Sequence, residues 1–297
     1  MRALGTLLIA VALFACQRSP ADRPREAPEP YGAAAEGRAT SSDGVRVHYR
    51  VAGAGSPALV FVHGWCCDAS YWDAQLRHFA PRHRVVAVDL AGHGPSGTGR
   101  TSWTIPAFAS DVRAVVESLD LGPAILVGHS MGGAVILEAA RMMPERVIGL
   151  VPVDSLHDVA SLPTAEAAKP FVDSFRGDFA AATRAMVRRL FPKDADPALV
   201  NRVGEDMAQA SPAIAVPALE GMFAYDAAGA LREIEMPIHA INGDVVPTDL
   251  EGNRTLAPQF KATVVPGVGH FPMLEAPERF NRVLGEVVRE IAAASGP

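Results

Sequence analysis

The chain has 297 residues, 49% of which are hydrophobic, and a formal net charge of −6. This length and composition suffice for one large α/β domain with its own core. The negative charge and the lack of a basic block of residues argue against a nucleic-acid partner.

The first residues predict export. Met1-Arg2 precede the apolar run ALGTLLIAVALFA, which is too short to span a bilayer but suits the hydrophobic region of a secretory signal. The run ends in LFAC, which resembles the lipobox of bacterial lipoproteins, whose cysteine is lipidated and becomes the mature N-terminus. We therefore interpret residues 1–16 as a signal peptide with a lipobox. The protein is expected to leave a bacterial cytoplasm for the periplasm or cell surface, with a lipid on Cys16 as its membrane contact; an ordinary signal peptide cut nearby is the alternative.

Residues 17–40 are rich in Pro, Ala and charged side chains. Such a composition cannot bury a core, so this segment is predicted to be a disordered tether. The two remaining cysteines, Cys66 and Cys67, are adjacent in the sequence. Because a disulfide between neighbours is severely strained, we expect two reduced, partly buried thiols without a catalytic role.

Strand-like and helix-like segments alternate from Val45 onward. Residues 45–53 alternate between apolar and polar side chains in the manner of a strand. The other short apolar runs are nearly continuous, which is typical of strands buried on both faces of a parallel sheet; they lie at 58–64, 84–92, 124–130, 146–154, 238–243 and 262–267. Apolar residues at helical spacing mark the stretches at 70–80, 105–120, 131–144 and 276–294. This order predicts the α/β class: a doubly wound, mostly parallel sheet with right-handed crossovers.

One interval contains no strand-like run. Between Asp154 and Pro237 only helical pieces are found, near 164–176, 179–191, 197–209 and 212–225. An interval of this length is too long for a loop in a compact domain. Residues 155–232 are therefore predicted to be a helical cap inserted into a core formed by 41–154 and 233–297. Since it follows a strand, the cap would lie over the crevice where open sheets bind ligands.

A G-x-S-x-G motif lies between a predicted strand and a predicted helix, with Ser130 at its centre. In this setting the motif is typical of a nucleophile elbow, a strained turn that exposes the serine hydroxyl. The turn also places the amide of Met131 at a helix N-terminus, where it can donate to an oxyanion. A glycine-rich turn with an incidental serine is the alternative.

A second oxyanion donor is expected from the segment FVHGW after an earlier strand. The backbone amide of Trp65 would face the elbow, and its indole would line the pocket. His63 and His129 are interpreted as structural histidines. The segment VDLAGHGPSG contains Asp89, His93 and Ser96, but we interpret it as a turn that braces the sheet.

The base is expected late in the chain. His270 lies on a loop with Gly267 and Gly269, between the last predicted strand and the last helix. Histidine can take up a hydroxyl proton and return it to a leaving group near neutral pH. A solvated loop histidine is the alternative; a metal site is not expected, because no second His or carboxylate stands at ligand spacing.

Four segments in order, HGW, DLAGHGPSG, GHSMGG and GVGHFPMLEAPERF, resemble the α/β-hydrolase fold superfamily. More narrowly, they are similar to its capped bacterial branch of serine hydrolases and esterases, which also contains C–C hydrolases, haloperoxidase-like enzymes, dehalogenases and epoxide hydrolases. The resemblance covers about residues 45–294. Its dehalogenases and epoxide hydrolases carry Asp at the elbow, so Ser130 favours acyl transfer.

The acid of the triad stays open between several aspartates. The superfamily usually places it after the penultimate strand, in a G-x-x-D pattern, but Val246 stands at that position. Asp154, at the end of the strand after the nucleophile helix, is our first choice, because one dehalogenase subgroup uses that strand end. Asp244 is the alternative, and Asp249 is a third candidate. The triad is recognised by geometry and not by position in the chain.

Together these observations predict a serine hydrolase that cleaves a carboxylic ester through Ser130, His270 and Asp154, with an acyl-enzyme intermediate and no cofactor or metal. A C–C hydrolase or a cofactor-free perhydrolase with the same triad is an alternative, and so is a non-catalytic ligand-binding homologue. An apolar, ester-like small molecule is the expected partner, because aromatic and methionine side chains are placed in the cap interior: Phe171, Phe175, Met186, Phe191, Met222, Phe223 and Tyr225.

Overall fold

The computed structural model describes residues 34–295. The predicted signal peptide, Cys16 and the tether as far as residue 33 lie outside the described residues. Within the described part, no helix combines the length and the apolar character needed to cross a membrane.

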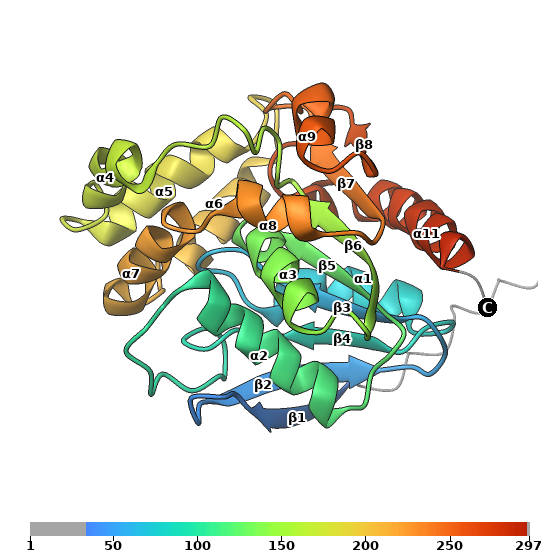
Figure 1. The fold of residues 1–297 in the computed structure, drawn as a ribbon. Coiled ribbons are helices and arrows are strands. Elements are labelled where there is room, and N and C mark those ends of the chain that lie inside the picture. The colour runs from blue at the N-terminus through green and yellow to red at the C-terminus, as the bar shows by residue number, and fades with distance from the viewer. Residues whose placement is uncertain (1–33, 296–297) are drawn as a thin grey trace, which may run out of the picture. The chain divides into compact units, whose positions relative to one another are not determined.

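An eight-stranded sheet has the strand order β1-β2-β4-β3-β5-β6-β7-β8 (Figure 1). The pairs β1–β2 and β2–β4 are antiparallel, and every other pair is parallel. This arrangement confirms the predicted fold class. The strands are β1 (Ala35–Thr40), β2 (Arg46–Ala52), β3 (Ala58–Val62), β4 (Val85–Val88), β5 (Ala124–His129), β6 (Val147–Val153), β7 (Ile238–Gly243) and β8 (Phe260–Val265).

Strand β1 corrects the prediction of a disordered tether through residue 40. Each of its residues pairs with β2, from Ala35 opposite Val51 to Thr40 opposite Arg46. Ala39 is its one buried residue. The polar composition of residues 35–40 predicted disorder, but an edge strand is held by main-chain hydrogen bonds and needs little apolar surface. Polar, exposed edge strands are common in sheets.

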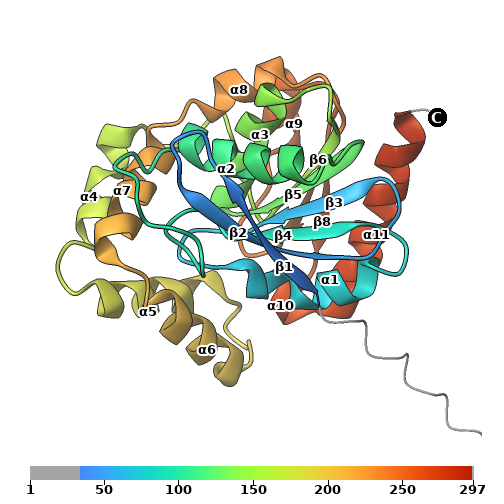
Figure 2. The same ribbon diagram turned by 90° about the horizontal axis from the view of Figure 1, so that it is seen from below.

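Helices cover both faces of the sheet. Figures 1 and 2 show α2 (Ile105–Ser118), α3 (Met131–Met142) and α8 (Ala227–Glu233) on one face, and α1 (Asp73–Phe79) and α11 (Pro277–Ala294) on the other. The core lies between these layers, where β3, β4 and β5 are buried along their whole lengths. Three short elements complete the unit: the 3-10 helix η2 (Ala69–Trp72), α9 (Leu250–Leu256) and α10 (Pro272–Glu275).

Four helices follow β6 before α8 and β7, and we call them the inserted helices: α4 (Ala165–Asp173), α5 (Phe179–Leu190), α6 (Pro197–Met207) and α7 (Pro212–Phe223). Their starts follow local sequence. The side chains of Thr164, Asp178 and Asp196 each accept a hydrogen bond from a first-turn amide, and prolines open α6 and α7. In both views these helices lie at one end of the sheet, the end where Ser130 follows β5.

Candidate active site

Ser130 occupies the turn between β5 and α3, with φ of 53° and ψ of −117°. A non-glycine residue rarely adopts positive φ, so this turn is strained. Hydrogen bonds hold it in place: the Ser130 amide donates to the Val153 carbonyl at 3.0 Å, and the Ser130 carbonyl accepts from the Ser155 hydroxyl at 2.9 Å. Gly128 is required beneath the turn, because a Cβ there would lie 2.3 Å from the Gly132 carbonyl oxygen.

Asp154 follows the neighbouring strand β6 and also has positive φ, 41°. Its amide donates to the Ile241 carbonyl at 3.0 Å, and its carboxylate oxygen Oδ1 accepts from the Gly243 amide at 2.8 Å. The other oxygen, Oδ2, lies 2.5 Å from Nδ1 of His270. Of the candidate acids, Asp154 is therefore the one that the fold brings to the predicted base.

The surroundings of Asp154 favour its charged form. Burial alone would raise its pKa, but hydrogen bonds from His157 and His270 outweigh burial and hold the pKa of this carboxyl well below its usual range. Asp154 is therefore an anion at neutral pH, facing the ring nitrogen of His270. An anion in this position stabilises a positive charge on that imidazole.

Asp244 and Asp249 lie elsewhere. Asp244 is exposed, and its carboxylate accepts from the Gly267 amide at 2.7 Å. Asp249 precedes α9 and accepts from the Gly252 amide at 2.9 Å, as an N-cap residue does. Within residues 34–295, neither aspartate forms a hydrogen bond with His270.

The loop that carries His270 is fixed from three directions. The His270 amide donates to the carbonyl of Leu190, at the end of α5, at 2.8 Å. Its carbonyl lies 2.8 Å from Nε2 of His129. The Glu275 carboxylate accepts from the amides of the residues before and after His270, at 2.8 and 2.9 Å. The contacts of Leu190 and Glu275 with this loop were not predicted from the sequence. The acidic residue five positions after His270 was the sequence feature that could have indicated Glu275.

The other motif histidines are structural. The Leu90 amide donates to Nε2 of His63 at 3.0 Å, and Nδ1 of His63 lies 2.8 Å from the Gly64 carbonyl. Burial lowers the pKa of His63 to about 3 and, together with the nearby His270, lowers the pKa of His129 to about 3. Both are neutral at physiological pH.

The DLAGHGPSG segment forms a hydrogen-bonded brace. The Asp89 carboxylate accepts from the Ala69 amide at 2.8 Å and lies 2.7 Å from Nδ1 of His48. The Ser96 hydroxyl donates to the Asp89 carbonyl at 2.6 Å, and Nδ1 of His93 lies 3.0 Å from the Ala91 carbonyl. These contacts tie the segment to η2 and β2.

The two predicted oxyanion donors belong to Met131, which follows Ser130 in the chain, and to Trp65, which follows Gly64, a neighbour of Ser130 in the fold. In residues 34–295, the amides of Trp65 and Met131 donate no hydrogen bond. Gly64 permits the approach of the Trp65 segment, since a Cβ on Gly64 would lie 3.2 Å from Cβ of Ser130. The Trp65 indole is anchored by its N–H, which donates to the Ala215 carbonyl in α7 at 2.7 Å. Preorganised, unsatisfied amides of this kind suit a developing oxyanion.

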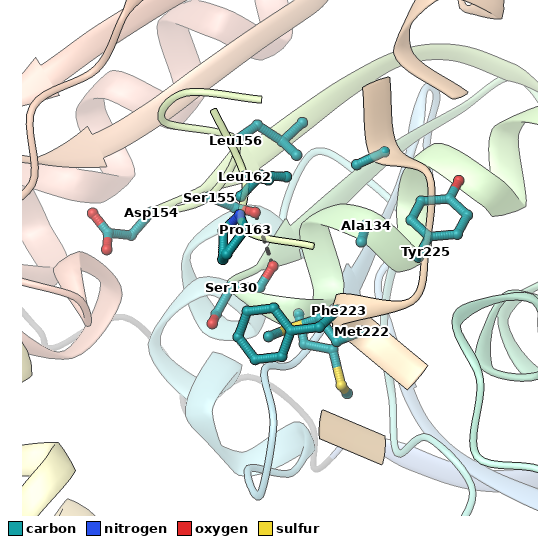
Figure 3. A pocket seen from close by; sticks show the side chains of 12 residues that line it. Ser130, Ala134, Asp154, Ser155, Leu156, Leu162, Pro163, Met222, Phe223 and Tyr225 are labelled. Atoms are coloured by element: carbon teal, nitrogen blue, oxygen red, sulfur yellow. Dashed lines mark hydrogen bonds between the residues drawn. The ribbon is translucent and has the colours of Figure 1, made fainter. Parts of the chain in front are cut away.

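Two cavities meet at Ser130, and Met222 of α7 lines both. We call the first the Tyr225 cavity; it has a volume of about 180 Å³ and is also lined by Met131, Ala134, Leu156, Leu162 and Phe223. Figure 3 shows Ser130 in the middle of this cavity's lining, between Asp154 and Tyr225. The second, the Phe271 cavity, has a volume of about 160 Å³ and is also lined by Trp65, His129, Phe171, Met186, Leu219 and His270.

The predicted cap-interior residues divide into two groups. Five of them line a cavity: Phe171, Met186, Met222, Phe223 and Tyr225. The other two are packing residues. Phe175 is 1% exposed and lies against Trp65 with ring centroids 5.2 Å apart, and Phe191 stacks on Phe271 at 5.1 Å. The cavity walls are thus mainly apolar.

Cys66 and Cys67 are buried free thiols, and burial raises the pKa of each well above its ordinary value. Protonated thiols are poor nucleophiles, so Cys67, which lines the Phe271 cavity, is not an alternative to Ser130. In the part of the chain that the structure describes, no group of three or more His, Cys, Asp or Glu residues could hold a metal ion.

Known proteins share this architecture. The chain is 31% identical over 265 residues to the dihydrolipoyllysine-residue acetyltransferase component of the acetoin cleaving system of Pseudomonas putida, a match to 82% of this chain and 66% of that protein. The match to the non-heme chloroperoxidase of Streptomyces lividans, at 39% identity, covers 41% of this chain and 46% of that protein. The chain therefore spans less than two thirds of these relatives.

A relative of similar length is the bifunctional esterase/perhydrolase of Acinetobacter calcoaceticus, 30% identical over 85% of this chain and 99% of that protein. The solved structure of a thermophilic esterase from Thermogutta terrifontis superimposes with a TM-score of 0.74 at 26% identity, over 87% of this chain and 99% of the other.

The family model described as "Alpha/beta hydrolase family" matches residues 59–283, which include Ser130, Asp154 and His270. This match confirms the resemblance read from the four sequence motifs. The chain belongs to the alpha/beta hydrolase family.

Proposed function

We propose that this protein hydrolyses small carboxylic esters through a Ser130–His270–Asp154 triad. One observation carries the proposal: the His270 ring lies 2.5 Å from the Asp154 carboxylate and lines the same cavity as Ser130. Asp154 accepts a hydrogen bond from Nδ1–H of His270, which keeps the proton on Nδ1 and so leaves Nε2 free to act as a base. The relatives named as esterases support the same activity.

The reaction begins when Ser130 Oγ attacks the ester carbonyl carbon while His270 takes the hydroxyl proton. The carbonyl oxygen becomes an oxyanion, which the amides of Trp65 and Met131 stabilise. Collapse of this intermediate breaks the C–O bond to the alcohol, and His270 returns the proton to the departing oxygen. A water molecule then repeats these steps on the acyl-enzyme, releasing the acid and restoring Ser130.

The two cavities support a separate site for each half of the ester. The departing alcohol must lie near the proton donor His270, so it belongs in the Phe271 cavity. The acyl group then occupies the Tyr225 cavity, beside the helix start at Met131. A cavity of about 150 Å³ accommodates a benzene-sized group. Each half of the substrate is therefore apolar and contains about six carbon atoms.

Turnover of p-nitrophenyl esters with graded acyl chains tests this proposal. We expect kcat/KM to be highest near butyrate and hexanoate and to fall steadily beyond octanoate, because longer chains exceed the Tyr225 cavity. Met222→Ala joins the two cavities and is expected to move the optimum to longer chains. Met236→Ala, which changes a half-buried methionine away from both cavities, is the matched control. An optimum at dodecanoate or no turnover of any ester would contradict the proposal.

Perhydrolysis is a second candidate, favoured by the Acinetobacter calcoaceticus relative, whose name includes this activity. Hydrogen peroxide would then replace water in the second half of the reaction and release a peracid. Peracid formation from an ester and hydrogen peroxide, compared between the wild type and Ser130→Ala, separates this activity from simple hydrolysis.

Export and membrane attachment are proposed from the N-terminal sequence alone. The apolar run ending in LFAC supports a lipid on Cys16, at the membrane of a bacterial cell. Incorporation of labelled palmitate into the wild type but not into Cys16→Ser is the expected result.

A further inference from the structure

A second histidine lies against the Asp154 carboxylate, on the side away from His270. Nε2 of His157 is 3.5 Å from Asp154 Oδ1, while His270 faces Oδ2. The His157 side chain is 16% exposed, and that of Asp154 is 4% exposed. Neither the nucleophile motif nor the proposed ester reaction accounts for a second imidazole at this carboxylate.

Asn242 and Thr248 hold the ring of His157. The Ser155 amide donates to Oδ1 of Asn242 at 3.2 Å. The Asn242 NH₂ group therefore points toward Thr248 and His157. That NH₂ group donates to the Thr248 hydroxyl at 2.9 Å and lies 3.4 Å from Nδ1 of His157. The Thr248 hydroxyl also lies 3.3 Å from Nδ1 of His157. Asn242 and Thr248 thus hold the Nδ1 side of the ring, and the Nε2 side faces Asp154.

The backbone of His157 is also held. Its carbonyl accepts from the Asp249 amide at 2.8 Å and from the Asn253 side chain at 3.2 Å. These contacts come from α9 and the residue before it, so the imidazole is positioned by the segment that follows β7. A histidine held at both its backbone and its ring is suited to orient the group that it faces.

We propose that His157 is a positioning residue for the triad: its ring packs against the Asp154 carboxylate and holds it toward His270. This inference rests on the proposed ester hydrolysis. Hydrogen bonds from His157 also contribute, with burial opposing them, to the lowered pKa of Asp154.

Asp154 is the carboxylate that His157 faces. The other acids nearby have their own partners: Asp249 accepts from the first turn of α9, Asp244 accepts from the loop after β8, and Glu275 accepts from the loop that carries His270. His157 therefore acts mainly on Asp154.

Two substitutions test the positioning role. His157→Leu removes the ring nitrogen that lies 3.5 Å from Asp154, and we expect kcat to fall about five- to tenfold with little change in KM, an effect of the size of one ordinary polar contact. His157→Gln keeps an N–H donor at the position of Nε2 and should restore most of kcat. His239→Gln, at a partly buried histidine on β7 that contacts Glu290 and Thr263, should leave kcat and KM unchanged.

A measurement that needs no substrate keeps this inference separable from the ester reaction. The low-field proton NMR signal of the His270 Nδ1–H group reports its hydrogen bond to Asp154. This signal should move away from its wild-type position in His157→Leu and stay near it in His157→Gln. Full kcat in His157→Leu, or an unmoved NMR signal in that variant, would overturn the inference. A wild type that shows this NMR signal but hydrolyses no ester would instead overturn the proposed function.

Discussion

Replacement of Asp154 by Asn tests the assignment of the acid. Both oxygens of the Asp154 carboxylate accept an N–H group: Oδ1 from Gly243 at 2.8 Å and Oδ2 from His270 at 2.5 Å. An Asn side chain has one oxygen, so its NH₂ group must face one of these two donors. If it faces His270, the imidazole must carry its proton on Nε2, the wrong tautomer for a base that accepts the Ser130 proton.

We expect Asp154→Asn to lower kcat by about 10³–10⁴, which corresponds to about 4–5.5 kcal/mol of activation free energy. Asp244→Asn is the matched control: it alters an exposed aspartate that accepts from the Gly267 amide, and Asn keeps an acceptor oxygen. Its kcat should stay within about threefold of wild type, as for most exposed substitutions. The assay is p-nitrophenyl butyrate hydrolysis with circular dichroism as a check of folding. A larger loss in Asp244→Asn than in Asp154→Asn would refute the assignment.

Two further predictions concern stability. The pKa values of His63 and His129 are lowered from 6.5 to about 3 in the folded protein, so the unfolded chain binds more protons between these pH values. The free energy of unfolding should therefore decrease as the pH is lowered through that window, by about 1.4 kcal/mol per pH unit for each histidine. His129→Gln should reduce this slope. Urea denaturation that gives constant stability from pH 7 to 5 would contradict the prediction. Gly128→Ala should destabilise the fold by at least about 3 kcal/mol, because the new Cβ would lie 2.3 Å from a backbone oxygen. Gly285→Ala in α11 is the control, since the nearest atom to its new Cβ would be 3.6 Å away. Thermal denaturation should show that this control is neutral or stabilising.

The fold class followed from local patterns. Buried apolar runs mark β3, β5 and β6 directly, because a parallel strand covered on both faces must be apolar throughout. The edge strand β1 could not be predicted in this way. Its sequence AEGRAT is polar, and its structure depends on pairing with β2, which only the assembled sheet provides.

The site likewise combines features that local sequence predicts with features that depend on the assembled fold. The turn at Ser130 is encoded within a few residues, so a motif predicts it. The choice between Asp154 and Asp244 depends on which carboxylate faces His270, more than a hundred residues from Asp154 in the chain. The contacts that hold the His270 loop, from Leu190 and Glu275, likewise depend on how distant helices pack.

The most direct test of the account is covalent labelling of the nucleophile. Incubation with a fluorophosphonate, followed by peptide mass spectrometry, should place a single phosphonyl group on Ser130, and Ser130→Ala should take up none. Ser96→Ala, which alters the serine of the bracing segment, should be labelled like the wild type provided that it folds. A wild type that is not labelled, or is labelled at another residue, would contradict the assignment of Ser130 as the nucleophile.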